Sequence, residues 1–250
     1  MHWSVKKILG LPVAATDGRI GEIYDIYFED SNWRVRYFVV DTGGWLHGRR
    51  VLISPHCAGK PDWTSPELPV ALTMKRVENS PRYETEQPIS RQYETELAGY
   101  YTWPEPLFYA PGAAMEIPPA VAFPVDRSLR ASVVERTPGP HLRSVRDTLG
   151  YAIHAADGDI GHAEDFIVDD DSWNIEKIVI DTRVWLPGKR VAISSQASKK
   201  IRWLDQAIYV GVSRREIENA PKFDESEPVN PKAEIHWYDY EGREKDPVLR

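Results

Sequence analysis

The chain matches itself when it is shifted by 140 residues, and this internal repeat constrains its fold more than any other feature. The segment Val39–Ser54, VVDTGGWLHGRRVLIS, recurs as VIDTRVWLPGKRVAIS at Val179–Ser194. Of the positions in residues 1–90, 29 are identical to their partners in residues 141–230, without a gap. The repeat predicts two copies of one domain of about 90 residues, a size at which domains can fold alone.

Residues 101–140 lie between the copies and hold 8 of the 20 prolines. So many prolines make a helix interior or a central β-strand unfavourable in residues 101–140. Aromatic residues are interleaved with the prolines, which leaves two interpretations open: a strap that packs on the domains, or a proline-rich ligand for a partner. We expect a first domain over residues 1–100, a connector over 101–140, and a second domain with its tail over 141–250.

Each copy has the pattern of short β-strands. An Asp-Gly hairpin at Asp17-Gly18 leads into a long strand over Ile20–Glu29, and Trp33–Val40 forms the next strand. Residues Thr73–Asn79 and Ser213–Asn219 form short helices that end before prolines. Five or six short strands remove their unpaired edges by closing. The predicted fold class is mainly β: two small barrels, each with a short C-terminal helix, arranged as a pseudo-twofold tandem pair.

Charge and composition exclude several classes of protein. The net charge is −7, with residues 1–90 neutral and residues 141–250 at −5, so nucleic acid is not an expected partner. No window approaches the ~20 apolar residues of a membrane span, and the N-terminus lacks a signal peptide's apolar run. The lone Cys57 forms no intrachain disulfide and excludes cysteine-based metal sites. We expect a cytoplasmic protein.

The histidines and acidic runs are the first candidates for a metal site. In the expected hairpin register His154 faces Gly161, which puts His154 and His162 on opposite faces of the sheet. Asp165 and Asp169-Asp170-Asp171 could offer oxygens to Ca²⁺, but they lack the spacing of an EF-hand loop. A solvated turn is the favoured interpretation, and neither a metal nor a cofactor is predicted.

Other residues invite a catalytic interpretation and are assigned to structure. Asp41-Thr42 recurs as Asp181-Thr182, and Asp25 recurs as Asp165, which favours use by the fold in both copies. His56-Cys57 could suggest a nucleophile, but the second copy has Gln196-Ala197 there. No catalytic residue is predicted, and the expected function is non-enzymatic.

Four aromatic residues are candidates for binding a partner. Trp45 and Trp185 follow the central strand in a turn, where they can plug the end of a barrel or anchor a partner. Trp103 and Tyr109 belong to the proline-rich connector. These four residues form the predicted partner-binding set.

The order D-G-x-I-G, then W-x-V-x-[YK]-[FI]-V-[VI]-D-T, then W-L-x-G-[RK]-R-V-x-I-S resembles the PRC-barrel domain of small bacterial proteins. This family is similar in fold to the cytoplasmic domain of the photosynthetic reaction-centre H subunit and to the C-terminal domain of a ribosome maturation factor. The resemblance implies a protein–protein binding or assembly module, here an adaptor or scaffold with an unnamed partner. Two alternatives are an accessory protein of a reaction-centre-like membrane complex and a factor linked to ribosome or RNA maturation. Packing of one barrel on the other, with homo-oligomers as a further form, is also expected.

Overall fold

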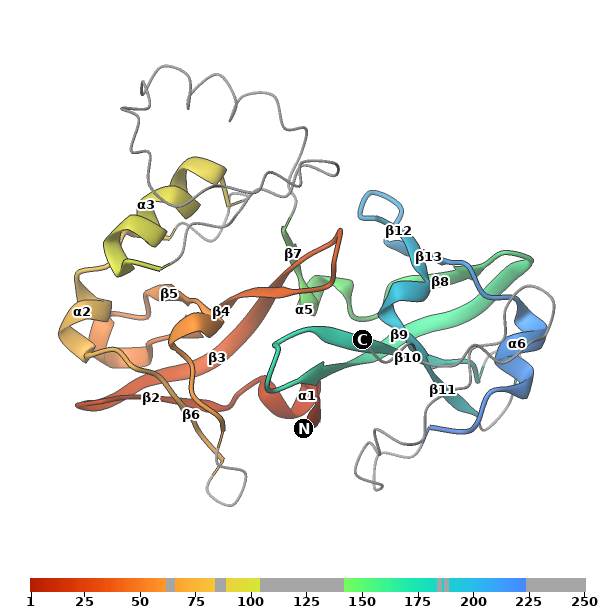
Figure 1. Ribbon diagram of the computed structural model, residues 1–250, viewed down its shortest axis with the longest axis horizontal. Helices are drawn as coiled ribbons and strands as arrows, with labels where there is room; N and C mark the ends of the chain where they lie inside the picture. Colours follow the sequence, from red (N-terminus) through yellow and green to blue (C-terminus); the bar gives the residue numbers. More distant parts are fainter. Residues whose placement is uncertain (62–65, 84–88, 104–141, 184–185, 187–188, 224–250) are drawn as a thin grey trace, which may run out of the picture. The chain divides into compact units, whose positions relative to one another are not determined.

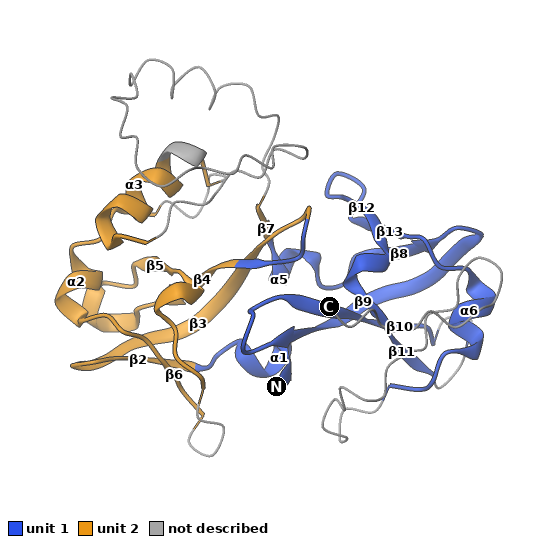
Figure 2. Cartoon of the chain, viewed as in Figure 1, with its two compact units in different colours: residues 1–11, 32–35, 144–250 blue, residues 12–31, 36–143 orange. Residues whose placement is uncertain are grey.

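The computed structural model describes residues 1–61, 66–83, 89–103, 142–183, 186 and 189–223 (Figure 1). The chain divides into two compact units, shown in Figure 2. Unit 1 contains residues 1–11, 32–35 and 144–250, and unit 2 contains residues 12–31 and 36–143. The units therefore do not coincide with the sequence repeats, because two segments of the first repeat belong to unit 1. Autonomous folding of residues 1–100 and 141–250 stays a prediction.

Unit 1 is built on one sheet in which most neighbouring strands are antiparallel. Its strand order is β11-β10-β9-β8-β13-β12, with β1 added on β9. The strands are β1 (His2–Ser4), β8 (Ala152–Ala155), β9 (Gly158–Asp169), β10 (Ile175–Asp181), β11 (Arg190–Ser194), β12 (Ser198–Arg202) and β13 (Ala207–Val210). The short helices are α1 (Val5–Ile8), α5 (Val145–Thr148) and α6 (Arg214–Asn219), with the 3₁₀ turn η3 (Ser195–Ala197). Buried residues alternate along β11, as the period of a strand predicts, whereas Ile178, Val179 and Ile180 of β10 are buried in succession.

The N-terminal segment is an integral strand of unit 1. Strand β1 pairs antiparallel with β9, with Trp3 opposite Val168 and Ser4 opposite Ile167. In helix α1, which follows β1, Val5 and Ile8 are fully buried. The first repeat thus completes a sheet whose other strands come from the second.

Unit 1 also takes in the turn of the first repeat around Trp33. Trp33 adopts φ 61°, so it lies in a turn and strand β4 begins only at Val35. Its ring packs 5.8 Å from that of Phe166, and its backbone carbonyl accepts a hydrogen bond from Ile175 at 2.8 Å. The strand expected over Trp33–Val40 is therefore two residues shorter at its start.

Unit 2 repeats the same frame at the offset of 140 residues. Its strand order is β5-β4-β3-β2-β6, with β7 paired to β3. The strands are β2 (Pro12–Ala15), β3 (Gly18–Glu29), β4 (Val35–Asp41), β5 (Arg50–Ile53), β6 (Leu68–Pro69) and β7 (Leu142–Ser144). The helical elements are η1 (Gly43–Leu46), η2 (Pro55–Cys57), α2 (Met74–Glu78) and α3 (Arg91–Tyr101). Helix α3 was not expected from the sequence.

The expected barrel closure is not found in the parts of the chain that the structure describes. Each sheet has two end strands, β11 and β12 in unit 1 and β5 and β6 in unit 2. Strands β11 and β12 are consecutive in the chain and joined by η3. Because these two end strands follow one another in the chain, the sheet must bend so that its two ends meet at the turn. The turn joins the end strands covalently, without hydrogen bonds between their backbones.

The short helices α2 and α6 form where side chains satisfy their free backbone groups. Thr73 and Ser213 are the N-caps, and Ser213 forms a capping box with Glu216. At the other end Arg49 donates to the carbonyl oxygens of Glu78 and Ser80 at 2.9 and 2.5 Å. Cations near a helix C-terminus are stabilising there. The two helices predicted from the sequence are thus present, each shorter by one or two residues.

Candidate functional site

The repeated Asp-Gly-x-Ile-Gly motif is a structural device in both units. The Asp17 carboxylate accepts a hydrogen bond from the first backbone N–H of α2 at 2.7 Å, and Asp157 does the same for α6 at 2.8 Å. The isoleucines that follow are fully buried. A Cβ on Gly21 would stand 1.9 Å from the carbonyl oxygen of Asp41, so only glycine permits this close approach of β3 to β4.

The turn after the central strand uses Asp41 and Thr42 as the sequence predicts. The Asp41 carboxylate accepts from the backbone of Gly43 at 2.9 Å, and the Thr42 hydroxyl donates to the carbonyl of Arg49 at 2.6 Å. In unit 1, hydrogen bonds from Arg183, more than its charge, lower the pKa of Asp181 to about 2. These carboxylates therefore hold turns.

The histidine register predicted from the sequence is wrong. Ala155 pairs with Gly158, so the turn is Ala156-Asp157, and a bulge follows that puts His154 opposite Asp159. The extra residue moves His154 and His162 to the same face of the sheet, because His162 pairs with Ala152. His154 Nδ1 lies 2.5 Å from Asp159 Oδ1, and its ring stacks 5.0 Å from that of Tyr209.

The acidic residues of the second repeat divide into two groups. Asp165 is buried at the β1–β9 junction, where it accepts hydrogen bonds from Ser4 and from the backbone of Lys6 and Phe166. Burial raises the pKa of its carboxyl. The second group is the only cluster of three metal-ligand residues in the described ranges: Asp169, Asp170 and Asp171, with oxygens within 4.8 Å of one another.

A cation of the chain itself lies among these three aspartates. The Met1 ammonium is 2.5 Å from Asp170 Oδ1 and 3.4 Å from Asp169 Oδ1. Asp170 also accepts from the indole of Trp3 at 3.0 Å. The Asp170 carboxylate therefore helps to hold β1 in place. The sequence does not show this role, because Met1 and Trp3 are far from Asp170 along the chain.

Cys57 is placed as a structural residue. Its thiol donates to the carbonyl of Ser54 at 3.0 Å, and burial raises its pKa to about 12. A thiol that stays protonated is a poor nucleophile. His56 precedes it in η2, where its backbone is capped by the Ser54 hydroxyl at 3.4 Å.

Two of the four predicted partner-binding residues are described, and both contact their own unit. Trp45 is half-buried and donates its indole N–H to the carbonyl of Ile20. Trp103 is stacked on Tyr101, with ring centroids 4.3 Å apart. Trp185 and Tyr109 lie outside the described residues. Whether these residues contact a partner stays a prediction.

Equivalent positions on the two long strands carry different chemistry. In unit 2 the guanidinium of Arg50 lies 3.5 Å from the centroid of the Tyr24 ring. At the same places in unit 1, Arg190 forms an ion pair with Glu164 at 3.3 Å. Tyrosine and arginine are enriched at protein interfaces, whereas glutamate is depleted there. The shared frame therefore presents an aromatic–cationic pair in one unit and an acid–base pair in the other.

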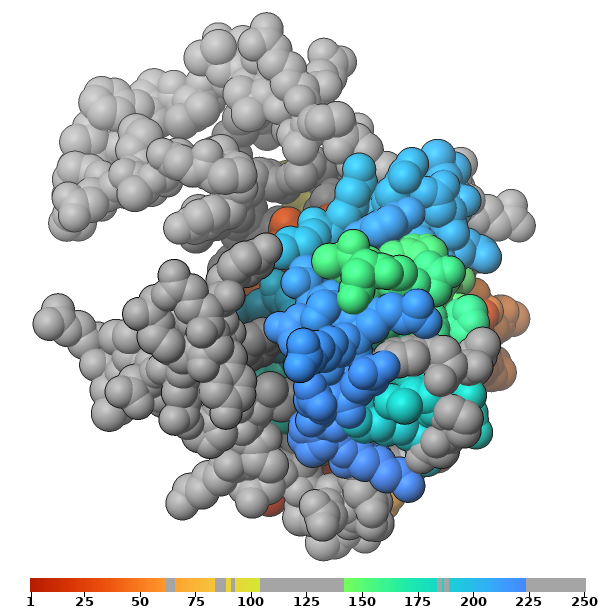
Figure 3. Space-filling view, turned by 90° about the vertical axis from the view of Figure 1, so that its right-hand side faces the viewer, coloured from red at the N-terminus to blue at the C-terminus, as the bar shows by residue number. Residues whose placement is uncertain are grey.

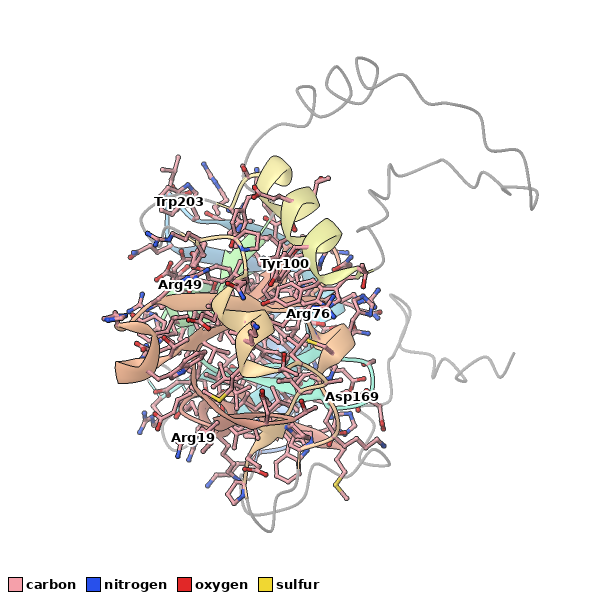
Figure 4. The ribbon with its side chains drawn as sticks, turned by 90° about the vertical axis from the view of Figure 1, so that its left-hand side faces the viewer. Arg19, Arg49, Arg76, Tyr100, Asp169 and Trp203 are labelled. Atoms are coloured by element: carbon pink, nitrogen blue, oxygen red, sulfur yellow. The ribbon has the colours of Figure 1, made fainter. Side chains whose placement is uncertain are left out.

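Helix α3 and the chain before it extend the aromatic character of unit 2. The Tyr27 and Tyr83 hydroxyls are 2.7 Å apart, and the Tyr83 ring lies 6.2 Å from that of Tyr93. Arg76 and Tyr100 are labelled in Figure 4, and the Tyr100 hydroxyl donates to the backbone carbonyl of Arg76 at 2.8 Å. We call Tyr24, Arg50, Tyr27, Tyr83 and Tyr93 the tyrosine surface.

A buried glutamate fixes α3 to the sheet of unit 2. Glu94 is fully buried and accepts from the Tyr37 hydroxyl at 3.2 Å, with an Arg36 nitrogen 3.6 Å away. Burial, together with the Glu94 charge, raises the pKa of Tyr37. The sequence signal for this helix was Ser90, its N-cap, which accepts from the backbone of Tyr93 at 3.2 Å.

The first repeat matches a known protein family over much of its length. Residues 4–60 match the PRC-barrel domain. This stretch includes the Asp-Gly-x-Ile-Gly motif, the Asp-Thr turn and Trp45. The PRC-barrel match begins in β1 and α1, which belong to unit 1, and continues through the strands of unit 2. No match was found among curated proteins.

Among the described helices, none is both long enough and apolar enough to cross a membrane.

Proposed function

We propose that the protein is a non-enzymatic adaptor, a binding and assembly module whose two units present different surfaces to different protein partners. The observation that carries this proposal is the contrast between the Arg50–Tyr24 and Arg190–Glu164 pairs on one shared frame. The PRC-barrel match supports a binding or assembly role in the same direction.

The use of the recurring polar residues supports the non-enzymatic part of the proposal. Asp17, Asp41 and Thr42, like their counterparts in the second repeat, hold helix starts and turns in place. A side chain that caps a backbone group is committed to that contact. What differs between the units is the chemistry of side chains on the outer face, which is where partner choice is decided.

The test exchanges the two surfaces one residue at a time in the full chain. Tyr24→Glu installs the residue of the second repeat, and Glu164→Tyr installs that of the first. Affinity capture from the native host with quantitative mass spectrometry should show one set of proteins lost with Tyr24→Glu and a different set lost with Glu164→Tyr. Thermal unfolding of each variant provides the control for folding.

The outcomes separate the parts of the proposal. If both variants lose the same set of proteins, the two units do not choose different partners. If neither loses any, these strand faces are not the binding surfaces. Turnover of a substrate by the purified protein would contradict the non-enzymatic role.

A further inference from the structure

The tip of one hairpin in unit 1 exposes two large apolar side chains side by side. Among the described residues, the exposed large hydrophobic side chains are Met1, Trp203 and Leu204. Trp203 is 59% exposed and Leu204 is 83% exposed, and both lie in the turn between β12 and β13. Figure 1 shows this hairpin projecting from its unit, and in Figure 3 its light-blue atoms lie at the upper edge of the coloured face.

The turn that carries these residues is held in a defined conformation. Arg202 Nε lies 2.9 Å from Asp205 Oδ2 across its base. Gln206 adopts a left-handed φ of 48° and donates its backbone N–H to the Trp203 carbonyl at 3.1 Å. The two apolar side chains are therefore fixed in an exposed position, although exposed apolar surface is unfavourable in water.

The strand behind the tip is basic in a chain that is acidic. Lys199, Lys200 and Arg202 are exposed on β12, and Asp205 is the one acid in residues 199–205, which gives this segment a net charge of +2. The whole chain has a net charge of −7. The corresponding segment of the first repeat, GKPDWTS at residues 59–65, keeps the tryptophan but has no net charge.

Protection of a sheet edge explains only part of this pattern. Strand β12 is an end strand of its sheet, and lysines on such strands prevent pairing with other chains. That role accounts for Lys199 and Lys200. It does not account for an exposed tryptophan and leucine at the turn, which would promote association rather than prevent it.

We propose that the β12–β13 hairpin docks unit 1 on an anionic lipid surface. Trp203 and Leu204 enter the headgroup region, and Lys199, Lys200 and Arg202 meet the lipid phosphates. Tryptophan is enriched at membrane–water interfaces because its ring is apolar and its N–H is polar. This inference uses residues outside the tyrosine surface and does not depend on the proposed protein partners.

The size of the tip favours lipid over a protein partner. A standard protein interface buries roughly 800 Å² on each side, far more than two side chains supply. A fluid surface needs no matching shape, and its negative charge complements the basic strand. Each basic residue near an anionic surface strengthens binding by about fivefold. Because the Debye length is about 10 Å at 0.1 M salt, charges farther than this from the bound surface are largely screened.

The experiment measures sedimentation of the full chain with lipid vesicles. The probes are vesicles of phosphatidylcholine alone and vesicles of equal parts phosphatidylcholine and phosphatidylglycerol. We expect binding to the anionic vesicles, weakened by salt, and little binding to phosphatidylcholine. Lys200→Gln should weaken binding about fivefold, whereas Lys75→Gln, a change of an exposed lysine in unit 2, should leave it unchanged.

Variants of the tip test the apolar part of the contact. The double variant Trp203→Ala with Leu204→Ala should lose most vesicle binding while keeping the same thermal midpoint, because both side chains are exposed. Lipids with brominated acyl chains should quench tryptophan emission in the wild type and less in Trp203→Phe. The wild type failing to bind anionic vesicles at low salt would overturn the proposal, as would binding by the double variant equal to that of the wild type. Loss of a captured protein by the double variant, without vesicle binding by the wild type, would instead identify the hairpin as a protein contact.

Discussion

Ser4 donates its hydroxyl hydrogen bond to the carboxylate of Asp165, although the two residues are 161 positions apart in the sequence. The same carboxylate accepts from the backbone N–H groups of Phe166 at 2.8 Å and Lys6 at 3.3 Å. Both side chains are buried where β1 pairs with β9. The contact ties the N-terminal segment to a strand of the second repeat.

Removing the Ser4 hydroxyl should destabilise the protein. Ser4→Ala leaves the buried Asp165 carboxylate with one donor fewer, which we expect to lower the free energy of unfolding by about 1–3 kcal/mol. Urea denaturation measures the change. Ser31→Ala, at an exposed serine, should stay within about 0.5 kcal/mol of the wild type. Equal effects of the two substitutions would show that the Ser4–Asp165 contact does not stabilise the fold.

The stability of the protein should depend on pH through Asp165. Burial raises its pKa above the usual value near 3.8, so the folded protein binds this proton more tightly than the unfolded chain does. Its contribution to the free energy of unfolding is therefore fully present below the usual value and is lost as pH rises through the raised pKa. The stability of the wild type relative to Asp165→Asn should fall as the pH rises above about 4. Urea titrations of both proteins across this range give the difference, and one that rises with pH would contradict the assignment.

The glycines of the repeated motif should not tolerate a side chain. A Cβ at Gly21 or Gly161 would stand 1.9 Å from the carbonyl oxygen of Asp41 or Asp181. We expect Gly21→Ala to cost about 1–3 kcal/mol or more, measured by thermal and urea unfolding. Gly44→Ala is the matched control, because a Cβ at Gly44 meets no atom within 4 Å. A Gly21→Ala variant as stable as the control would show that the strands can move apart there.

The thiol of Cys57 should react slowly in the folded protein. With its pKa raised to about 12, the thiolate fraction at pH 8 is on the order of a thousandfold lower than in an unfolded chain. Labelling by Ellman's reagent should be slow in buffer and fast in urea. Cys57→Ala, which copies Ala197 of the second repeat, should give no signal in either condition. Similar rates with and without urea would mean that the thiol is accessible and ionised.

Much of the fold could be predicted because its signals are local. Hairpin glycines, β-branched strands and the helices that end before Pro81 and Pro221 depend on residues close in the sequence, and they appear where expected within one or two positions. The histidine register failed because a bulge between Asp159 and Gly161 shifts the pairing of β8 with β9, and the alternation of residue types in the sequence does not show a bulge. Helix α3 was missed because its docking depends on Glu94 reaching Tyr37 in a distant strand.

The candidate surfaces were predicted only in part for the same reason. A tryptophan was expected to mark a contact, yet the described Trp45 and Trp103 pack on their own unit, while Trp203, which was not singled out, is exposed. Whether a side chain is exposed depends on which other elements pack over it. The spacing of aromatic residues in the sequence does not show this. The contrast between Tyr24 and Glu164 is visible in the sequence, but its significance depends on the contact that each makes with an arginine two strands away in its sheet, on β5 or β11.

The sequence by itself determined the repeat and the order of the strands along each copy. Only the tertiary structure decided which strand β1 joins. Strands β3 and β9 have the same length and nearly the same backbone frame, so each offers an edge to an extended segment. Strand pairing uses backbone hydrogen bonds that every residue except proline can make. The choice of β9 therefore depends on side chains brought together by folding, such as His2 with Glu176, whose counterpart in the first repeat is Arg36.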